Sequence, residues 1–350
     1  MALYPLLRPL IFAVDAERAH GLTLAALKLM PPGETAADPL LATNVAGLLF
    51  PNPIGLAAGF DKDAEVFGQI LGLGFGFSEV GTLTPLPQAG NPKPRLFRLA
   101  EDRAVINRMG FNNGGQQAAL ARLQGRRRGG IVGVNIGANK DSADRVADYA
   151  AGVRAMRGVA DYLTVNISSP NTPGLRALQD KAALGELLSA VRDARGPDGP
   201  PVFLKLAPDL ERQDIDDIAT LAIDLGIDAL IVSNTTVSRP RLVSTHRGEA
   251  GGLSGAPLKA LALQRLRDFR SATGGALPLI AAGGIENGVD AYARIRAGAS
   301  LVQLYSALVY RGPGLAKLIA AELKTLLQRD GFENMGHAIG TDVGVPGNTS

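Results

Sequence analysis

The sequence predicts an α/β protein whose main domain is a (β/α)8 TIM barrel preceded by an N-terminal helical extension. Eight short apolar segments recur from residue 54 onward, and most of them are separated by helix-like sequence. The segments are apolar throughout rather than alternating, which indicates parallel strands buried on both faces. Eight strand–helix units in roughly 250 residues match the size of such a barrel. We expect the extension at residues 1–40, the barrel at 41–330 and a flexible C-terminal tail at 331–350.

The extension reads as two short helices. The first, LYPLLRPLIFAV, covers residues 3–14, and the second, DAERAHGLTLAALKLMPP, covers residues 15–32. Asp15 has a side chain suited to cap the second helix, and the proline pair at its end would stop it. Positive charge comes from Arg8, Arg18, His20 and Lys28. Two interpretations remain: residues 1–30 rest in a membrane interface, or they pack on the main domain, which the pattern alone slightly favours.

The eight expected strands are bounded by Gly, Asn, Ser or Pro, which are typical turn residues. They occupy residues 54–58, 77–81, 131–136, 162–167, 202–206, 229–234, 277–282 and 300–305. A doubly wound sheet is the competing architecture, and it would usually carry a Gly-rich fingerprint after its first strand. The nearest candidate, GLGFGF at 72–77, precedes a strand and lacks the third glycine, so we interpret it as a turn.

Two connections, 82–130 and 235–276, are too long for a single crossover helix. Long loops in a compact domain are usually functional. Residues 331–350 are polar and Gly-rich, which predicts a loose tail.

Composition narrows the chemistry. There is no Cys, and the three histidines are widely spaced, so disulfides, a thiol nucleophile and a His-based metal site are not expected. The net charge is +3, and the basic run Arg126–Arg128 has no aromatic neighbours, which favours a solvated loop over nucleic-acid binding. No apolar run reaches the ~18 residues needed to span a bilayer, and no signal-peptide pattern is present. We therefore expect a reducing, cytoplasmic compartment.

The ends of the expected strands carry a ring of Asn, Ser, Thr and Gly together with Lys62 and Lys205. In a barrel of this kind, the chemistry lies at the carboxyl ends of the strands. The segment NISSPN at 166–171 has no acid, His or Cys, which suits a ligand recognised by hydrogen bonds. At any single strand end, a role in a helix cap or a turn explains the polar residues about as well as a role in ligand binding. They do not explain Lys205, because a lysine inside an apolar strand is rarely buried without a partner.

The ends of the last two strands indicate a phosphate site. Gly283 and Gly284 follow one strand, and Tyr305 and Ser306 follow the next. Backbone N–H groups there would hold a dianion. Flavin mononucleotide (FMN) fits such a site, because a lysine near its pyrimidine edge, here Lys205, stabilises the charge of the reduced ring.

These segments resemble the dihydroorotate dehydrogenase family, in its class 2, quinone-dependent type. The resemblance covers roughly residues 1–325, with the motifs in the family's order. They are AAGFDKD, EVGTLTP, NPKPRLFRL, INRMGFNN, NIGANK, NISSPNTPGLR, KLAPD, SNTT, GGLSG, GGI and YSALVYRGPG. Ser169 stands where class 1 relatives carry a catalytic Cys, and the N-terminal helices are also a class 2 feature. Ala64 replaces the Gly common after DKD, which touches no expected contact.

The resemblance implies FMN-dependent oxidation of dihydroorotate to orotate in pyrimidine synthesis, with electrons passed to ubiquinone or menaquinone. It implies a peripheral protein on the cytoplasmic face of the membrane, docked through residues 1–30. Ser169 is implied to be the catalytic base. The implied FMN contacts are Ala58, Gly59, Phe60, Asp61, Lys62, Thr82, Asn135, Asn166, Lys205, Ser233, Gly255, Gly284, Tyr305 and Ser306. The implied substrate contacts are Lys62, Asn107, Arg108, Met109, Gly110, Phe111, Asn166, Asn171, Asn234 and Thr235.

These residue types suit that chemistry. The substrate ring presents alternating donors and acceptors, which carboxamides pair with, and Lys62 offsets the substrate carboxylate. The reaction removes a proton from C5 and a hydride from C6. A serine hydroxyl is a weak base at neutral pH, so Ser169 needs an acidified proton and a relay through a hydroxyl such as Thr172 or through water.

Three other functions remain open. A flavin barrel reducing fumarate or NAD is disfavoured by Ser169 and the extra helices. A flavin-free phosphate-binding barrel would need an acid/base pair at the strand tips, where the carboxylates are Asp61, Asp141, Asp209 and Glu286. A membrane-docked binding protein would not need two lysines directed into a barrel mouth.

Overall fold

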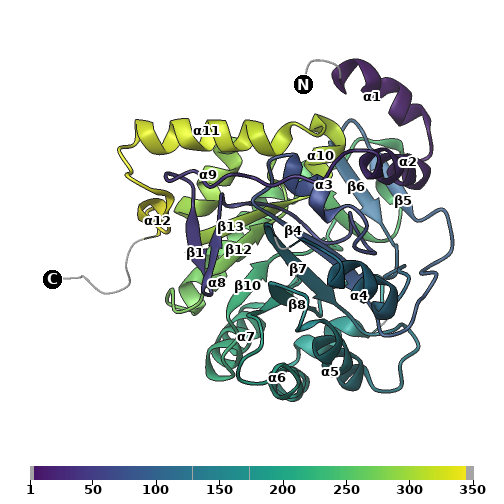
Figure 1. The fold of residues 1–350 in the computed structure, drawn as a ribbon, viewed down its shortest axis with the longest axis vertical. Helices are drawn as coiled ribbons and strands as arrows, with labels where there is room; N and C mark the ends of the chain where they lie inside the picture. The colour runs from purple at the N-terminus through teal and green to yellow at the C-terminus, as the bar shows by residue number, and fades with distance from the viewer. Residues whose placement is uncertain (1–3, 128, 173, 344–350) are drawn as a thin grey trace.

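The computed structural model describes residues 4–127, 129–172 and 174–343 and contains a closed barrel of eight parallel strands (Figure 1). Each strand coincides with one predicted from the apolar segments. The strands are β3 Ile54–Leu56, β4 Phe77–Leu83, β7 Ile131–Ile136, β8 Tyr162–Asn166, β9 Val202–Leu206, β10 Ala229–Val232, β12 Leu279–Ala282 and β13 Ala299–Leu304. Around the barrel their order is β10–β12–β13–β3–β4–β7–β8–β9. The predicted fold class is therefore confirmed.

Helices cover the outside of the barrel, as continuously apolar strands require. They are α3 Phe67–Gly72, α4 Gln116–Gln124, α5 Arg145–Met156, α6 Lys181–Arg195, α7 Arg212–Asp224, α8 Lys259–Ala272, α9 Gly288–Arg296, α10 Ser306–Arg311 and α11 Leu315–Arg329. Short 3-10 turns lie at Leu175–Gln179, Thr245–Gly248 and Ala256–Leu258. Several helices begin with an Asp or Asn cap; for example, Asn287 accepts from the N–H of Asp290 at 2.8 Å. The capping interpretation of a polar strand tip is thus correct for Asn287.

Aromatic side chains fill the amino-terminal end of the barrel. Phe77, Tyr162 and Phe203 are fully buried there, and Tyr162 stacks on Phe203 at 4.4 Å between ring centroids. A Cβ on Gly55 would lie 2.2 Å from the Phe77 ring, so the ring fits because Gly55 has no side chain. The hairpin of β1 Thr43–Val45 and β2 Leu48–Phe50 adds Phe50 below Phe77. Packing closes this end and leaves the opposite, carboxyl end for a site.

The two long connections contain a second sheet that the sequence did not predict. Strands β5 Leu96–Leu99 and β6 Ala104–Asn107 come from the first connection, and β11 Gly252–Gly255 comes from the second. They pair antiparallel in the order β11–β6–β5. Segments about 150 residues apart therefore form one wall at the carboxyl end of the barrel.

The N-terminal helices α1 Tyr4–Ala13 and α2 Ala16–Lys28 rest on this sheet and on the end of the barrel. Asp15 caps α2 by accepting from the N–H of Arg18, as predicted. Arg98 of β5 donates to the carbonyl groups of Ile11, Phe12 and Val14 at the end of α1. In the described part of the chain, every helix is too short or too polar to cross a bilayer.

One face of the helix pair is packed, and the other is exposed and apolar. Ala19 and Leu27 are buried against the core. The exposed apolar side chains are Leu6, Leu7, Leu10, Leu22, Leu29 and Met30, with Leu6 at 73% and Leu29 at 88% of full exposure. The prediction that these helices pack on the main domain is thus confirmed for one face, and an apolar face remains exposed.

Two local expectations differ from the structure. The C-terminal segment is packed as far as residue 343: Met335 and Ala338 of α12 Met335–Ala338 are buried, and Arg296 pairs with Asp342. Its polar composition conceals the two apolar side chains that anchor it, and residues 344–350 lie outside the described part. The solvated-loop prediction is wrong for Arg126, whose side chain is 2% exposed and pairs with Asp161 at 2.8 Å. Arg128 also lies outside the described residues.

Candidate active site

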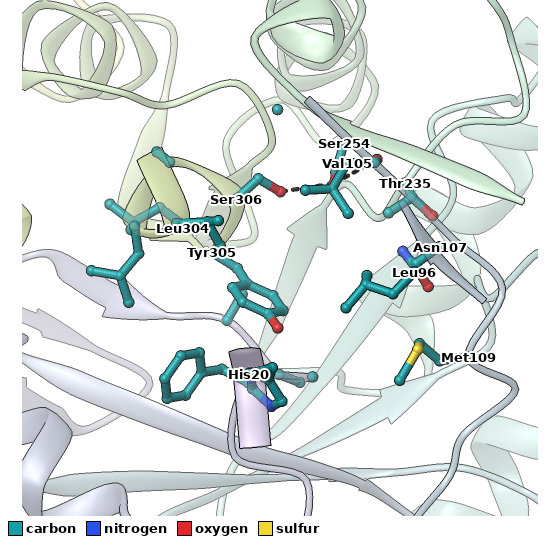
Figure 2. Close-up of a pocket in the computed structure, with 18 of the residues that line it drawn as sticks. His20, Leu96, Val105, Asn107, Met109, Thr235, Ser254, Leu304, Tyr305 and Ser306 are labelled. Carbon is teal, nitrogen blue, oxygen red and sulfur yellow. Dashed lines mark hydrogen bonds between the residues drawn. The ribbon is translucent and has the colours of Figure 1, made fainter. Parts of the chain in front are cut away.

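A single cavity of about 820 Å³ extends from the strand tips to the N-terminal helices (Figure 2). Most of the residues expected at the site line it, although they come from separate strands and loops. They are Ala58, Gly59, Phe60, Lys62, Thr82, Asn107, Met109, Gly110, Phe111, Asn166, Ser169, Asn171, Lys205, Ser233, Asn234, Thr235, Gly255, Gly284, Tyr305 and Ser306. Residues of α1 and α2, among them Ile11, Ala19 and Leu27, line the other part of the same cavity.

Three expected contact residues do not line the cavity. Asp61 accepts hydrogen bonds from the N–H groups of Glu65 and Val66, so it shapes the turn that carries Lys62. Asn135 is fully buried beneath Thr82 and Asn166. Arg108 pairs with Glu249 at 2.8 Å and covers the Phe97 ring. The structure thus places the polar groups of these three residues in contacts outside the cavity lining, and their contact with FMN or substrate stays a prediction.

Carboxamides in the cavity wall and directly beneath it form a connected row. Asn166 Nδ2 donates to Asn135 Oδ1 at 3.1 Å and to Thr82 Oγ1 at 3.0 Å. Asn166 Oδ1 accepts from Ser168 Oγ at 2.9 Å, and Ser168 Oγ accepts from Asn234 Nδ2 at the same distance. Because these bonds join four strand ends, the amides hold one another in defined orientations.

Ser169 follows this row in a loop after β8. Its side chain is buried, and its Oγ accepts from the N–H of Asn171 at 3.3 Å. Asn171 Nδ2 in turn donates to Asn107 Oδ1 at 3.3 Å, which links the loop to β6. The buried Thr172 Oγ1 has no hydrogen-bond partner within the described residues. The Ser169 hydroxyl therefore accepts a backbone hydrogen bond, is shielded from water and lies beside amides that can pair with a ligand.

Two lysines, Lys62 and Lys205, also line the cavity. Burial lowers the pKa of Lys62 to about 8, although the charges of Glu17 and Asp63 oppose the shift. Burial also lowers the pKa of Lys205, and the Glu79 carboxylate opposes that shift. Each lysine therefore loses its proton more readily than a lysine in water.

The glycine-rich end forms a backbone cradle. A Cβ on Gly284 would lie 2.4 Å from Lys259 Cα, and Gly284 has a φ of +70° that favours glycine. Ser306 and Ser254 hydroxyls lie 2.7 Å apart across this end, as the dashed line in Figure 2 shows. Arg103 also lines it and pairs with Glu286 at 2.9 Å. Backbone N–H groups and hydroxyls of this kind bind phosphate.

The cavity residues fit FMN, because two buried polar atoms are left for a ligand to bind. Ser233 Oγ and Gln303 Oε1 are buried in residues that line the cavity, and neither has a partner among the residues described. Buried polar atoms without partners are rare, and a ligand is one of the groups that can satisfy them. Ser233 follows β10, and Gln303 lies in β13, the strand that leads to Ser306.

Sequence reasoning missed several residues of the site. Glu79 is a buried acid within an apolar strand, and Gln303 is a buried amide within another, so the argument that identified Lys205 would have found both. His20 was expected to be positively charged, and this is wrong. It lies 5.1 Å from the Phe60 ring and 6.3 Å from the Tyr305 ring, where burial and the charge of Lys62 lower its pKa to about 3. Figure 2 shows His20 and Tyr305 on one side of the cavity.

Comparisons with known proteins identify one family. The dihydroorotate dehydrogenase family profile matches residues 40–327. A dihydroorotate dehydrogenase (quinone) from Erythrobacter litoralis is 63% identical over 342 residues, covering 97% of this chain and 100% of the relative. One from Sphingopyxis alaskensis is 65% identical, covering 97% of each chain.

Solved structures show the same fold. The dihydroorotate dehydrogenase of Eimeria tenella in complex with ferulenol is similar with a TM-score of 0.89 and 44% identity, covering 94% of this chain and 96% of that one. Its ligand-free form gives a TM-score of 0.90 and 43% identity, covering 94% of this chain and 100% of that one. This chain therefore belongs to the dihydroorotate dehydrogenase family, in its class 2, quinone-dependent branch.

Proposed function

We propose that this protein oxidises dihydroorotate to orotate with FMN and passes the electrons to a membrane quinone, as a step of pyrimidine biosynthesis. One observation carries the proposal. The cavity that contains Ser169 and the amides continues without a break to the apolar inner side of α1 and α2. A polar substrate and an apolar electron acceptor can therefore approach one redox group from different ends.

FMN would lie between the glycine cradle and the amide row, and it supplies an acceptor for a hydride and a donor of electrons. Gly255, Gly284 and Ser306 would hold its phosphate with backbone N–H groups and a hydroxyl. Lys205 would meet the edge of the ring where negative charge collects on reduction. The partnerless Ser233 Oγ supports the same placement.

Dihydroorotate would lie against the amides and Lys62. Asn107, Asn171 and Asn234 come from three different segments and offer both donors and acceptors. Lys62 below its pKa would pair with the substrate carboxylate. Met109, Gly110 and Phe111 line the same region and would cover the ring.

Ser169 would remove the C5 proton. The Asn171 N–H that donates to Ser169 Oγ stabilises negative charge developing on that oxygen, which strengthens a weak base. Burial keeps bulk water away from the reacting atoms. The buried hydroxyl of Thr172 is available as the next proton carrier, directly or through a water molecule.

The exposed face of α1 and α2 would rest on the cytoplasmic surface of the cell membrane. Its leucines would enter the interface, and Arg8 and Arg18 would meet anionic headgroups. A quinone would then leave the bilayer between the two helices and approach the flavin past Tyr305.

Ser169→Ala tests the catalytic assignment. The purified variant should keep its flavin content and its affinity for orotate, because the change removes one buried oxygen. Anaerobic mixing with dihydroorotate should bleach the flavin about 10²–10⁴-fold more slowly, which is the usual contribution of a general base. A bleaching rate within threefold of the native rate would show that Ser169 is not the base.

Deletion of residues 1–30 tests the quinone route. Electron transfer to a soluble dye should survive, whereas transfer to a long-tailed quinone should be lost. A milder variant, Leu6→Ser with Leu10→Ser, should lose binding to anionic vesicles without loss of dye reduction. Leu49→Ser is the matched control, since Leu49 is 63% exposed on the β1–β2 hairpin, away from α1 and α2 in Figure 1. Equal loss of dye and quinone activity in the deletion would instead indicate a role in folding.

A further inference from the structure

We propose that Glu79 is a positioning residue that, through Asn135, sets which edge of Asn166 is the donor and which is the acceptor in the amide row. Its side chain is fully buried in β4, inside the barrel. It accepts four hydrogen bonds: from Asn135 Nδ2 at 2.7 Å, Gln303 Nε2 at 2.7 Å, Tyr162 OH at 3.1 Å and Thr164 Oγ1 at 3.2 Å. The inference rests on the proposed assignment of Asn166 and Asn234 to the substrate.

The chemistry of a carboxylate gives this network a direction. An ionised carboxylate accepts hydrogen bonds and donates none, whereas a carboxamide has one edge of each kind. Asn135 must therefore turn its Nδ2 toward Glu79, which leaves its Oδ1 to accept from Thr82 Oγ1 at 2.6 Å and from Asn166 Nδ2.

The same reasoning applies to the next side chains of the row. Asn166, having given its Nδ2 to Asn135, is left with its Oδ1 for the Ser168 hydroxyl. Once that hydroxyl donates to Asn166, its oxygen is left to accept from Asn234 Nδ2. The sense of the bonds from Glu79 to Asn166 thus starts at one acceptor-only group. The N–H groups of Ser168 and Thr235 donate to Asn166 Oδ1 at 3.3 Å and to Asn234 Oδ1 at 2.8 Å, and they hold the far end of the row in the same sense.

Hydrogen bonds must choose the orientation of these side chains, because the two edges of a carboxamide have nearly the same shape. Turning an amide over costs little packing energy, so packing alone does not choose its orientation. A reversed Asn166 or Asn234 would present a donor where the ligand expects an acceptor, and an unmatched buried polar group weakens binding. The Glu79 carboxylate also favours the charged form of Lys205, because it opposes the lowering of the Lys205 pKa by burial.

The test is the affinity of the oxidised, FMN-loaded enzyme for orotate, measured by titration of the flavin absorbance. Glu79→Gln keeps the shape but adds a donor, so it should weaken orotate binding by about tenfold, which lies in the lower half of the range for one unsatisfied buried group. Asn135→Ala should weaken binding similarly, because it cuts the row while keeping the Glu79 charge. If Glu79→Gln does not fold, Asn135→Ala tests the proposal in its place.

Two reference variants separate the outcomes. Tyr162→Phe removes a different donor to Glu79 and leaves the amide row intact, so it should change orotate affinity less than twofold. Asn234→Ala removes a proposed substrate contact directly and should weaken binding about tenfold.

If Asn234→Ala weakens binding while the Glu79 and Asn135 variants stay within twofold of the native protein, the positioning role is wrong and the substrate assignment stands. If Asn234→Ala has no effect, the substrate assignment fails and the inference with it. If Tyr162→Phe weakens binding as much as Glu79→Gln, the effect is one of packing, and the positioning role is again wrong.

Discussion

Lys62 should make substrate binding depend on pH in a range where a lysine in water does not titrate. Burial lowers its pKa from 10.5 to about 8, with Glu17 and Asp63 opposing the shift. Below pH 8 the ammonium group is charged and pairs with the carboxylate of the ligand. Above pH 8 the proton is lost, and binding must supply the energy to restore it.

The size of the effect follows from the pKa. One pH unit above the pKa, about one lysine in ten carries a proton, so the Kd for orotate should be about tenfold higher at pH 9 than on its plateau below pH 7. Glu17 on α2 favours the charged lysine, so Glu17→Gln should move the inflection to lower pH. The N-terminal extension would thereby influence the substrate site through charge alone.

The lowered pKa of Lys62 also affects the stability of the folded protein, which should rise with pH, whereas ligand binding should weaken with pH. The folded protein without substrate holds the Lys62 proton less tightly than the unfolded chain does. Its free energy of unfolding should therefore rise as the pH increases from about 8 toward 10.5, since the unfolded chain binds more protons there. Lys62→Met should remove this rise.

The assay is a titration of flavin absorbance with orotate between pH 6.5 and pH 9. Lys62→Arg is the matched control, because an arginine stays charged throughout and should bind orotate without an inflection near pH 8. Lys62→Met should bind weakly at every pH. A native profile that stays flat across pH 8, or an inflection that persists in Lys62→Arg, would refute the assignment of this titration to Lys62.

Two further changes test the cradle and the fold. Gly284→Ala places a Cβ 2.4 Å from Lys259 Cα and should sharply reduce the FMN content of the purified protein. Gly47→Ala is the control, because Gly47 has a similar positive φ but a Cβ there would meet nothing within 4 Å. This control should retain FMN and lose only about 1–2 kcal/mol of stability. Full FMN occupancy in Gly284→Ala would exclude the cradle. Arg126→Ala leaves Asp161 without its 2.8 Å partner and should destabilise the fold by about 3 kcal/mol in urea unfolding, while exposed Arg127→Ala should cost less than about 0.5 kcal/mol. Equal midpoints for the two arginine variants would show that the buried pair contributes nothing.

Local signals predicted much of this molecule. An apolar run without alternation identifies a strand buried on both faces, and each of the eight runs became a barrel strand. Polar residues after those runs were predicted to meet because parallel strands end at one rim, and Ser169, Asn234 and Lys205 do line one cavity. The same logic applied to Glu79 and Gln303 would have extended the site inward.

Other features were beyond such reasoning because they depend on distant partners. The pairing of β6 with β11 joins segments whose own patterns indicate only long loops. Arg108 belongs to a motif that includes cavity residues, yet Glu249 and Phe97 hold its side chain away from the cavity. His20 lies on an exposed-looking helix, yet its imidazole packs against the rings of Phe60 and Tyr305, where burial and the charge of Lys62 lower its pKa to about 3.

By itself the sequence determined the barrel, the position of its functional end and the family, because strand burial and turn chemistry are encoded within a few neighbouring residues. Only the tertiary structure decided the continuous cavity, the direction of the amide row and the charge states of Lys62 and His20. Those properties come from desolvation and from hydrogen bonds between segments far apart in the chain, and neither exists until the chain has folded.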